Sequence, residues 1–237
     1  MQIFISPAKT FSSTSVPSTQ RPHFLNEAEQ LIVQLKTLSS ADLEKKMRLS
    51  APLAQTTYED YQAFGKNTAP AIFSYAGQQY RYLNPASLTT QALDWLNSHL
   101  YMISGLYGLL RPLDAISRYR LEMQDTSMTS LYTFWTPKIF TYLKPFQKQL
   151  FINLASKEYS QVLSSFDQLI TIQFYQLKND KLSIHSMELK KMRGLFLRAM
   201  ALNEVKSLED IKKITVEYYL YNSTLSNEKL LTFVKKV

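Results

Sequence analysis

Cysteine is absent from the 237-residue sequence, and histidine occurs only at positions 23, 99 and 185. The missing cysteines exclude disulfide frameworks, thiolate zinc sites, iron–sulfur ligation and cysteine nucleophiles together. The three histidines are far apart in the chain, and none belongs to a His-x-x-x-His or Glu-x-x-His pair. We therefore expect no metal site and no cofactor, and direct iron storage or chelation is disfavoured.

Long apolar runs are also absent. No stretch approaches the roughly 18 apolar residues of a membrane-spanning helix. The N-terminal segment MQIFISPAKT lacks the cationic region of a signal peptide, and its apolar run is too short. We therefore predict a cytoplasmic protein that makes no contact with a membrane.

The sequence is instead rich in apolar and basic residues. Hydrophobic residues make up 45%, which is enough for a substantial core and too many for a disordered chain. Lysine and arginine total 27 against 19 aspartates and glutamates, which gives a net charge of +8. Such an excess favours a polyanion as partner, because phosphate backbones attract clustered lysine and arginine. A basic surface that is only solvated would have the same total, so the positions of the cations must decide.

Apolar residues recur at helical spacing in several segments, the first of them residues 24–38. A second helix is predicted after Ser39, because Ser39 and Asp42 have the spacing of a capping box. Pro52 marks the first turn of a third helix. Further helices are predicted over residues 88–103 and 187–202.

Short apolar runs between these helices predict strands at residues 2–5, 150–154, 168–175, 182–185, 214–221 and 230–234. Residues 178–181 form a predicted turn, so the strands on either side of it make a hairpin. Arg118–Met123 alternates polar and apolar residues, which predicts another strand with Arg118, Arg120 and Glu122 on one face. Because helices and strands are interleaved without a linker or repeat, we predict a mixed α/β (α+β) fold with a single compact domain over residues 1–237.

Two of the five glycines lie in the segment ISGLYGLLRPLD, residues 103–114. Gly105 and Gly108 permit a tight reversal after a helix that ends near Ser104, and Arg111 stands beside it. Backbone N–H groups at a helix start bind anions. The segment is therefore similar to the helix–hairpin–helix element that contacts DNA backbones, with a glycine spacing one residue wider. A structural corner between two helices explains the same pattern equally well.

The last predicted helix has a basic face. Lys190, Gly194 and Arg198 follow at intervals of four, with Lys191 beside them, and Arg193 lies near the edge of the apolar stripe. A glycine between two cations would let a phosphate backbone approach closely. A solvated basic face explains the pattern as well.

Ser6-Pro7-Ala8-Lys9 matches the S-x-x-K pattern of serine acyl enzymes. The same pattern recurs at residues 226–229, and the first copy follows a strand and a proline rather than opening a clear helix. We therefore interpret it as a strand-to-loop turn that presents Ser6, Lys9 and Thr10 to a phosphate group. It is not a Walker A loop, which requires glycines.

Specific motifs are spread in order over nearly the full length of the chain. They are ISPAKT at residues 5–10, SGLYGLLRPLD at 104–114, YRLEM at 119–123, LYTFW at 131–135, INLASKEY at 152–159 and KKMRGLFLR at 190–198. Taken together, they resemble the family of the bacterial peroxide stress protein YaaA.

The resemblance implies a mixed α/β fold peculiar to that family, described as cantaloupe-like, with a positively charged cleft. It also implies binding to double-stranded or structured DNA, and a role in limiting free iron and oxidative DNA damage under hydrogen peroxide. The DNA- or phosphate-binding residues that the resemblance implies are Lys9, Arg111, Arg118, Arg120, Lys190, Lys191, Arg193 and Arg198. Gly105 and Gly108 join these candidates because of the predicted glycine turn. Polar members of the same motifs are Ser6, Thr10, Glu122, Asn153, Ser156, Glu158 and Tyr159.

Three functional hypotheses follow. The first is a DNA-binding stress protein that contacts the sugar–phosphate backbone with little sequence preference. The second is an enzyme that acts on a nucleotide or on damaged nucleic acid, with Glu122 and Glu158 as acid/base groups and the cations as phosphate ligands. Ion pairs of Arg118 or Arg120 with Glu122 explain the same residues structurally. The third is an interaction protein whose effect on iron is indirect.

The first hypothesis makes a geometric demand. Lys9, Arg111, Arg120 and Arg198 must converge on one concavity if they bind one backbone. The oligomeric state is left open by the sequence, with which a monomer is compatible.

Overall fold

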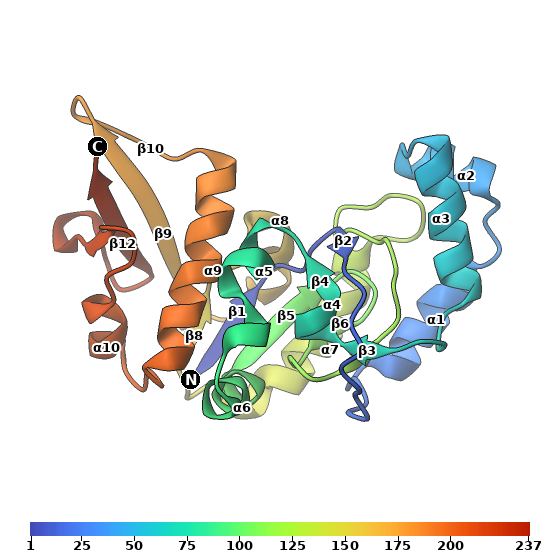
Figure 1. Ribbon diagram of the computed structural model, residues 1–237, viewed down its shortest axis with the longest axis horizontal. Helices are drawn as coiled ribbons and strands as arrows, with labels where there is room; N and C mark the ends of the chain where they lie inside the picture. Colours follow the sequence, from blue (N-terminus) through green and yellow to red (C-terminus); the bar gives the residue numbers. More distant parts are fainter.

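A mixed eight-stranded sheet forms the centre of the fold in the computed structural model, which describes residues 1–237 (Figure 1). The strands follow the order β11-β12-β9-β8-β1-β5-β6, and β10 pairs with β9. The inner pairs β5–β1, β1–β8, β8–β9 and β9–β12 are parallel, whereas β6, β10 and β11 pair antiparallel at the margins. The strands are β1 (Gln2–Ile5), β5 (Leu100–Ser104), β6 (Gly108–Leu110), β8 (Phe151–Asn153), β9 (Leu169–Lys178), β10 (Lys181–Ser183), β11 (Leu220–Tyr221) and β12 (Leu230–Lys236).

The central strands are short apolar runs that are buried on both faces. All residues of β1 and of β5 are buried, as expected of parallel strands covered on each side. Phe4 of β1 stacks on Tyr101 of β5 at a centroid distance of 5.7 Å and lies 5.3 Å from the ring of Phe151 in β8. Neighbouring strands therefore share one aromatic core.

Helices and short strand pairs surround this sheet. Figure 1 shows α1, α2 and α3 at one end of the molecule, β9, β10, β12 and α10 at the other, and β1 and β5 between them. None of the helices is both long and apolar enough to cross a membrane. The helices are α1 (Leu25–Leu35), α2 (Ser40–Met47), α3 (Ala51–Gln62), α4 (Ala71–Ser74), α5 (Gln78–Leu83), α6 (Thr90–His99), α7 (Leu131–Leu143), α8 (Lys157–Ser160), α9 (Ser186–Leu202) and α10 (Leu208–Lys213). The short pairs are β2 (Thr10–Phe11) with β4 (Tyr75–Ala76) and β3 (Ala69–Pro70) with β7 (Ala115–Ile116).

Local signals in the sequence mark several element boundaries correctly. Ser39 accepts a hydrogen bond from the backbone of Asp42, whose carboxylate accepts one from the backbone of Ser39, so the predicted capping box is formed. Pro52 lies in the first turn of α3. The predicted turn over residues 178–181 connects β9 to β10. The mixed α/β fold class is confirmed.

Helix α9 packs closely on α5. Met192, Phe196 and Met200 are buried on one face of α9. Gly194 is buried on another face, and a Cβ atom there would collide with the carbonyl oxygen of Gln79 in α5. The glycine thus serves contact between two helices, and the prediction that it admits a phosphate backbone is wrong.

The predicted helix–hairpin–helix element is not present. Gly105 and Gly108 lie in a β-hairpin between β5 and β6. Gly108 has a φ of +67° and faces the ring of Trp135, while a Cβ at Gly105 would meet the carbonyl oxygen of Leu121. The helix expected to end near Ser104 ends at His99, where β5 takes over. Both glycines are buried, so neither offers its backbone to DNA.

Two further strand predictions are wrong. Arg118–Met123 has no strand partner, although its apolar residues are buried and its polar ones more exposed in the predicted alternation. Of residues 214–221, only Leu220–Tyr221 forms a strand, β11. In Arg118–Met123 the alternation therefore reports burial correctly but does not indicate a hydrogen-bonded neighbouring strand.

Candidate functional site

A cavity of about 270 Å³, which we name the Lys9 cavity, lies beyond the carboxyl ends of β1 and β8. Strands β1 and β8 are parallel neighbours, so the loops that follow them emerge at the same edge of the sheet. The chain also moves from β1 to β5 on one side and from β8 to β9 on the other. Ligands bind at such switch points in open α/β sheets. The lining residues are Ser6, Pro7, Ala8, Lys9, Thr10, Ala76, Gly77, Gln78, Gln79, Tyr80, Ser156, Glu158, Tyr159, Lys190 and Arg193.

Hydrogen bonds tie the walls of the cavity together around Ser6. The backbone N–H of Ser156 donates to Ser6 Oγ at 2.9 Å, which links the loop after β1 to the loop after β8. The Ser6 carbonyl accepts from Gln79 Nε2 at 3.1 Å and from the Tyr80 hydroxyl at 2.9 Å, both on α5. Three separate segments are thus held in fixed positions, so the cavity is preorganised.

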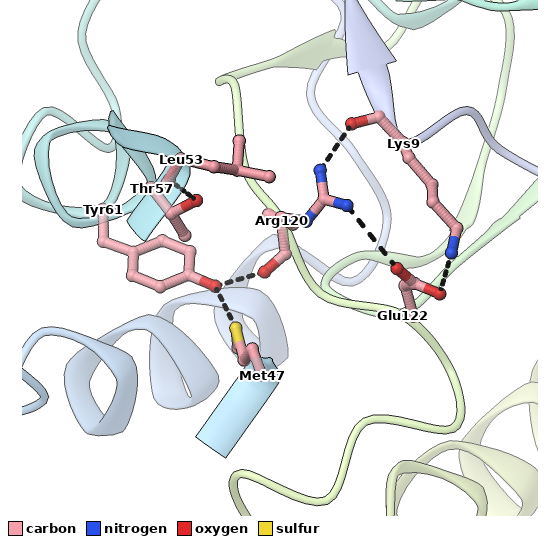
Figure 2. Close-up of polar contacts among 7 residues, drawn as sticks. All are labelled: Lys9, Met47, Leu53, Thr57, Tyr61, Arg120 and Glu122. Carbon is pink, nitrogen blue, oxygen red and sulfur yellow. Dashed lines mark hydrogen bonds and ion pairs between the residues drawn. The ribbon is translucent and has the colours of Figure 1, made fainter. Parts of the chain in front are cut away.

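Lys9 lines the cavity and is exposed at its mouth. Figure 2 shows this lysine in a small network of charges with Arg120 and Glu122. Its Nζ lies 2.5 Å from Glu122 Oε2, and its side chain is 58% exposed. Arg120 approaches Glu122 Oε1 at 3.9 Å and donates to the Lys9 carbonyl at 3.5 Å. Tyr61 of α3 donates to the carbonyl of Arg120, and burial raises the pKa of Tyr61, which keeps this donor protonated. The pairing of Arg120 with Glu122 agrees with the structural alternative from the sequence, in which Glu122 forms an ion pair with a neighbouring arginine.

Glu158 supplies a carboxyl group with a perturbed environment. Burial raises its pKa, as does the negative charge of Glu122, while backbone N–H groups of Gln124 and Met123 and the positive charge of Lys9 oppose the shift in part. Its Oε1 is buried and has no hydrogen-bond partner. A carboxyl group of this kind can act as a proton donor or as an acceptor for a ligand.

Arg193 is the lining cation that is mostly covered and yet has no protein partner. Lys9 is paired with Glu122 and Lys190 is exposed to solvent, whereas the guanidinium of Arg193 is mostly covered and its buried Nε has no acceptor. Burial lowers the pKa of Arg193 to about 10, with no opposing contribution from a carboxylate. Arg193 also lines a neighbouring cavity with Asn153, so it separates two hollows. No group of three or more His, Asp or Glu side chains is placed to hold a metal ion.

Comparison of the sequence with known proteins shows the family of this chain. The family model described as "Peroxide stress protein YaaA" matches residues 1–225. The chain belongs to the YaaA family. It is similar to a UPF0246 protein of Francisella philomiragia, with 35% identity over 254 residues that cover 99% of this chain and 100% of the relative. UPF0246 proteins of Lachnoclostridium phytofermentans (247 residues; 99% and 96% covered) and Legionella pneumophila strain Lens (255 residues; 99% of both) are each 34% identical. The family's description connects it with peroxide stress.

Two arginines of the YaaA motifs point away from the cavity and bind main-chain carbonyls. Arg111 donates to the carbonyls of Asn97 at 3.1 Å and Ser98 at 2.9 Å. Its guanidinium also lies 4.1 Å from the centroid of the Tyr101 ring. Arg198 donates to the carbonyls of Leu83 at 2.9 Å and Asn84 at 3.1 Å, which end helix α5. These contacts hold elements together.

Further members of the YaaA motifs are engaged elsewhere. Arg118 lies 3.7 Å from Asp60 of α3. Lys191 is paired with Glu217 at 3.2 Å and with Glu188 at 3.8 Å. Asn153 donates to Thr171 and accepts from the backbone of Ala155, which braces β8 against β9. The structure thus brings together Ser6, Lys9, Thr10, Ser156, Glu158, Tyr159, Lys190 and Arg193 at the Lys9 cavity, with Arg120 and Glu122 beside Lys9.

The segment Ala76–Tyr80 contributes a wall that the sequence reasoning missed. Gln78, Gln79 and Tyr80 open α5 directly after Gly77. A scarce glycine before two glutamines was the available signal, since glycine permits the chain to turn at a helix start. Nothing in the spacing of these residues indicates that they meet the loop after β1.

Proposed function

We propose that this member of the YaaA family is a peroxide-stress protein that binds DNA by its sugar–phosphate backbone at the mouth of the Lys9 cavity. The observation that carries the proposal is a pair of exposed lysines at this cavity, Lys9 after β1 and Lys190 on α9. They come from distant parts of the sequence and present positive charge at one place. The net charge of +8 adds a long-range attraction for a polyanion.

Double-stranded or structured DNA is the partner that fits this arrangement. Contacts to phosphates carry little sequence preference, because every nucleotide offers the same group. Arg120 lies next to Lys9, and it extends the basic surface once a DNA phosphate replaces Glu122 as the partner of these two cations. We propose that the DNA-bound protein limits free iron and oxidative DNA damage under hydrogen peroxide.

Titration of a labelled duplex at rising salt tests the binding. The logarithm of the affinity should fall linearly with the logarithm of the salt concentration, by about 0.9 for each phosphate contact. Lys9→Ala and Lys190→Ala should each weaken binding uniformly across sequences and reduce this slope by about one. Lys191→Ala is the matched control, because Lys191 is adjacent on α9 but paired with Glu217. Binding that does not respond to salt, or no binding at low ionic strength, contradicts the proposal.

Protection of DNA is measured separately. A supercoiled plasmid is exposed to ferrous iron and hydrogen peroxide with and without the protein, and strand breaks are counted on a gel. Fewer breaks with the native chain than with the Lys9→Ala, Lys190→Ala double variant support protection through binding. Equal protection by both chains contradicts it.

A second candidate is an enzyme that acts on a nucleotide or on damaged nucleic acid in the same cavity. The observation in its favour is Glu158, whose raised pKa and unpaired Oε1 suit a general acid. Incubation with nicked, bubbled and abasic duplexes should give a product that Glu158→Gln fails to make. Absence of any product with the native chain argues against turnover.

A further inference from the structure

Unpaired polar atoms are concentrated around the Lys9 cavity. Six buried side-chain polar atoms in the whole chain have no hydrogen-bond partner, and three of them belong to residues that line this cavity. They are Gln78 Oε1, Glu158 Oε1 and Arg193 Nε. Buried polar groups in native proteins are nearly always paired, so a cluster of exceptions calls for an explanation, and a ligand is one.

Arg193 is the most informative of the three. A guanidinium removed from water is costly unless it meets an acceptor, and a carboxylate is its usual partner. Here no ion pair or hydrogen bond engages it, and burial alone lowers its pKa to about 10, so it stays charged at neutral pH. The planar guanidinium presents N–H donors in a fork that matches the oxygens of a phosphate or a carboxylate. The arginine therefore defines an anion subsite in the wall of the cavity.

The other two atoms need the opposite kind of partner. Gln78 Oε1 can only accept a hydrogen bond, and Glu158 Oε1 accepts one when the carboxyl group is ionised. A ligand that satisfies them carries N–H or O–H donors as well as an anionic group. Inorganic phosphate alone carries no donors besides its own acidic O–H groups.

Two buried tyrosines line the same cavity as these polar groups and add apolar surface to it. Tyr80 is 3% and Tyr159 is 6% exposed, and both line the cavity. Aromatic side chains are the usual surface against which a nucleic-acid base packs. The volume of about 270 Å³ suits one small molecule rather than a polymer.

We propose that the Lys9 cavity binds one nucleoside monophosphate unit, with its phosphate on Arg193 and its hydrogen-bond donors on Gln78 and Glu158. The site goes beyond the proposed backbone contacts, which involve the exposed Lys9 and Lys190 and do not require Arg193. The unit comes from a free mononucleotide or from an unpaired nucleotide of a strand, and the chemistry of recognition is the same for both sources.

Calorimetric titration with AMP, GMP, CMP and UMP, and with adenosine and inorganic phosphate, tests the site. At least one mononucleotide should bind about tenfold more tightly than phosphate or adenosine alone, because only it engages both subsites. Arg193→Met should weaken that binding at least about tenfold, since it removes a charge-assisted contact. Lys191→Met, on the same helix and paired away from the cavity, should leave the binding of the mononucleotide unchanged.

A bubbled duplex tests whether the bound nucleotide belongs to a strand. If Arg193 is required for binding to the bubbled duplex but not to the intact duplex, the nucleotide unit is an unpaired nucleotide of a strand.

Thermal unfolding separates a binding role of Arg193 from a structural one. Because the guanidinium is mostly covered and its buried Nε has no partner, Arg193→Met should keep or raise the melting temperature of the free protein. Added mononucleotide, or bubbled DNA, should stabilise the native chain and not the variant. A marked loss of melting temperature in the free variant assigns Arg193 to the fold and overturns the proposal. Gln78→Met is the second variant, and it must weaken binding while the chain stays folded.

The outcomes are distinct from those of the DNA proposal. Loss of nucleotide binding in Arg193→Met with an unchanged salt slope on intact duplex supports both proposals. Nucleotide binding without duplex binding overturns only the backbone proposal. If neither a mononucleotide nor a bubble requires Arg193, the cavity proposal is overturned whatever the duplex does.

Discussion

The ammonium group of Lys9 lies 2.5 Å from a carboxylate oxygen of Glu122, so a cation at the mouth of the cavity is already neutralised by the protein itself. Arg120 shares the same carboxylate at 3.9 Å. A phosphate that binds Lys9 must therefore compete with Glu122. The pair sets how strongly the mouth of the cavity attracts an anion.

Glu122→Gln should strengthen binding to duplex DNA about twofold to fivefold at low salt. The amide keeps the size of the side chain and removes the competing charge, and a partly exposed ion pair is worth up to about 1 kcal/mol. Fluorescence anisotropy with a labelled duplex measures the change. Glu209→Gln is the control, because it removes the same charge from the Lys212 pair on α10. An unchanged affinity in Glu122→Gln would show that Lys9 does not meet DNA.

Gly194→Ala should destabilise the fold by about 2 kcal/mol or more. An alanine inside a helix is ordinarily favoured over glycine by about 1 kcal/mol, but here its Cβ collides with the carbonyl oxygen of Gln79. Urea unfolding followed by circular dichroism gives the difference. Gly77→Ala is the control, since its Cβ would meet Ala8 at an ordinary 3.4 Å. Equal effects of the two substitutions would count against the close packing of α5 and α9.

Arg198→Met should lower the free energy of unfolding by about 1–2 kcal/mol and leave the salt dependence of DNA binding unchanged. The guanidinium donates to two carbonyls at the end of α5, and hydrogen bonds from charged groups contribute about that much. Lys190→Met, two turns earlier on α9, should do the reverse, because Lys190 is exposed at the cavity. The crossed result is measured by urea unfolding and by duplex titration on the same samples. A reduced salt slope in Arg198→Met would place this arginine at the DNA after all.

Local interactions explain which parts of the fold could be predicted. The capping box of Ser39 and Asp42 is complete within four residues, so the sequence contains all of it. The helix expected over residues 88–103 fails at its end, because Leu100 and Ile103 continue the helical spacing of α6 by coincidence. They belong to the buried strand β5, whose partner β1 lies at the other end of the sequence. Only the tertiary pairing separates the two interpretations.

The same limit applies to the candidate site. Lys9 and Arg198 both stand in basic motifs, and the sequence gives them equal weight. In the fold Lys9 lines the cavity, whereas Arg198 binds the carbonyl groups at the C-terminus of α5. Carbonyl groups without a partner at a helix terminus attract a guanidinium, as a phosphate does. Of the four cations expected to converge, Lys9 and Arg120 are neighbours, while Arg111 and Arg198 are held elsewhere. The prediction that all four meet in one concavity is therefore wrong, and any backbone contact must rely on cations other than Arg111 and Arg198.

Asp114 gives the fold a dependence on pH whose sign follows from its burial. The side chain is 2% exposed and accepts hydrogen bonds from the backbone of Arg111 at 2.7 Å and from Gln20 at 2.8 Å. Burial raises the pKa of Asp114 to about 6, and these hydrogen bonds and the charge of Arg111 oppose the shift only in part. Between pH 4 and pH 6 the folded chain therefore holds a proton that the unfolded chain has lost.

The free energy of unfolding should consequently fall as the pH rises through this window, and the fall should be complete above the folded pKa. A shift from 3.8 to about 6 corresponds to at most about 3 kcal/mol. Burial also raises the pKa of Asp60 and Glu158, so the native chain shows their sum, and Asp114→Asn isolates one contribution. Urea unfolding of both chains is measured at pH 4, 5, 6, 7 and 8. The difference in stability between them should change between pH 4 and pH 6 and be constant from pH 7 to pH 8. Parallel curves for the native chain and Asp114→Asn would contradict the assignment, because they would mean that Asp114 titrates alike in the folded and unfolded states.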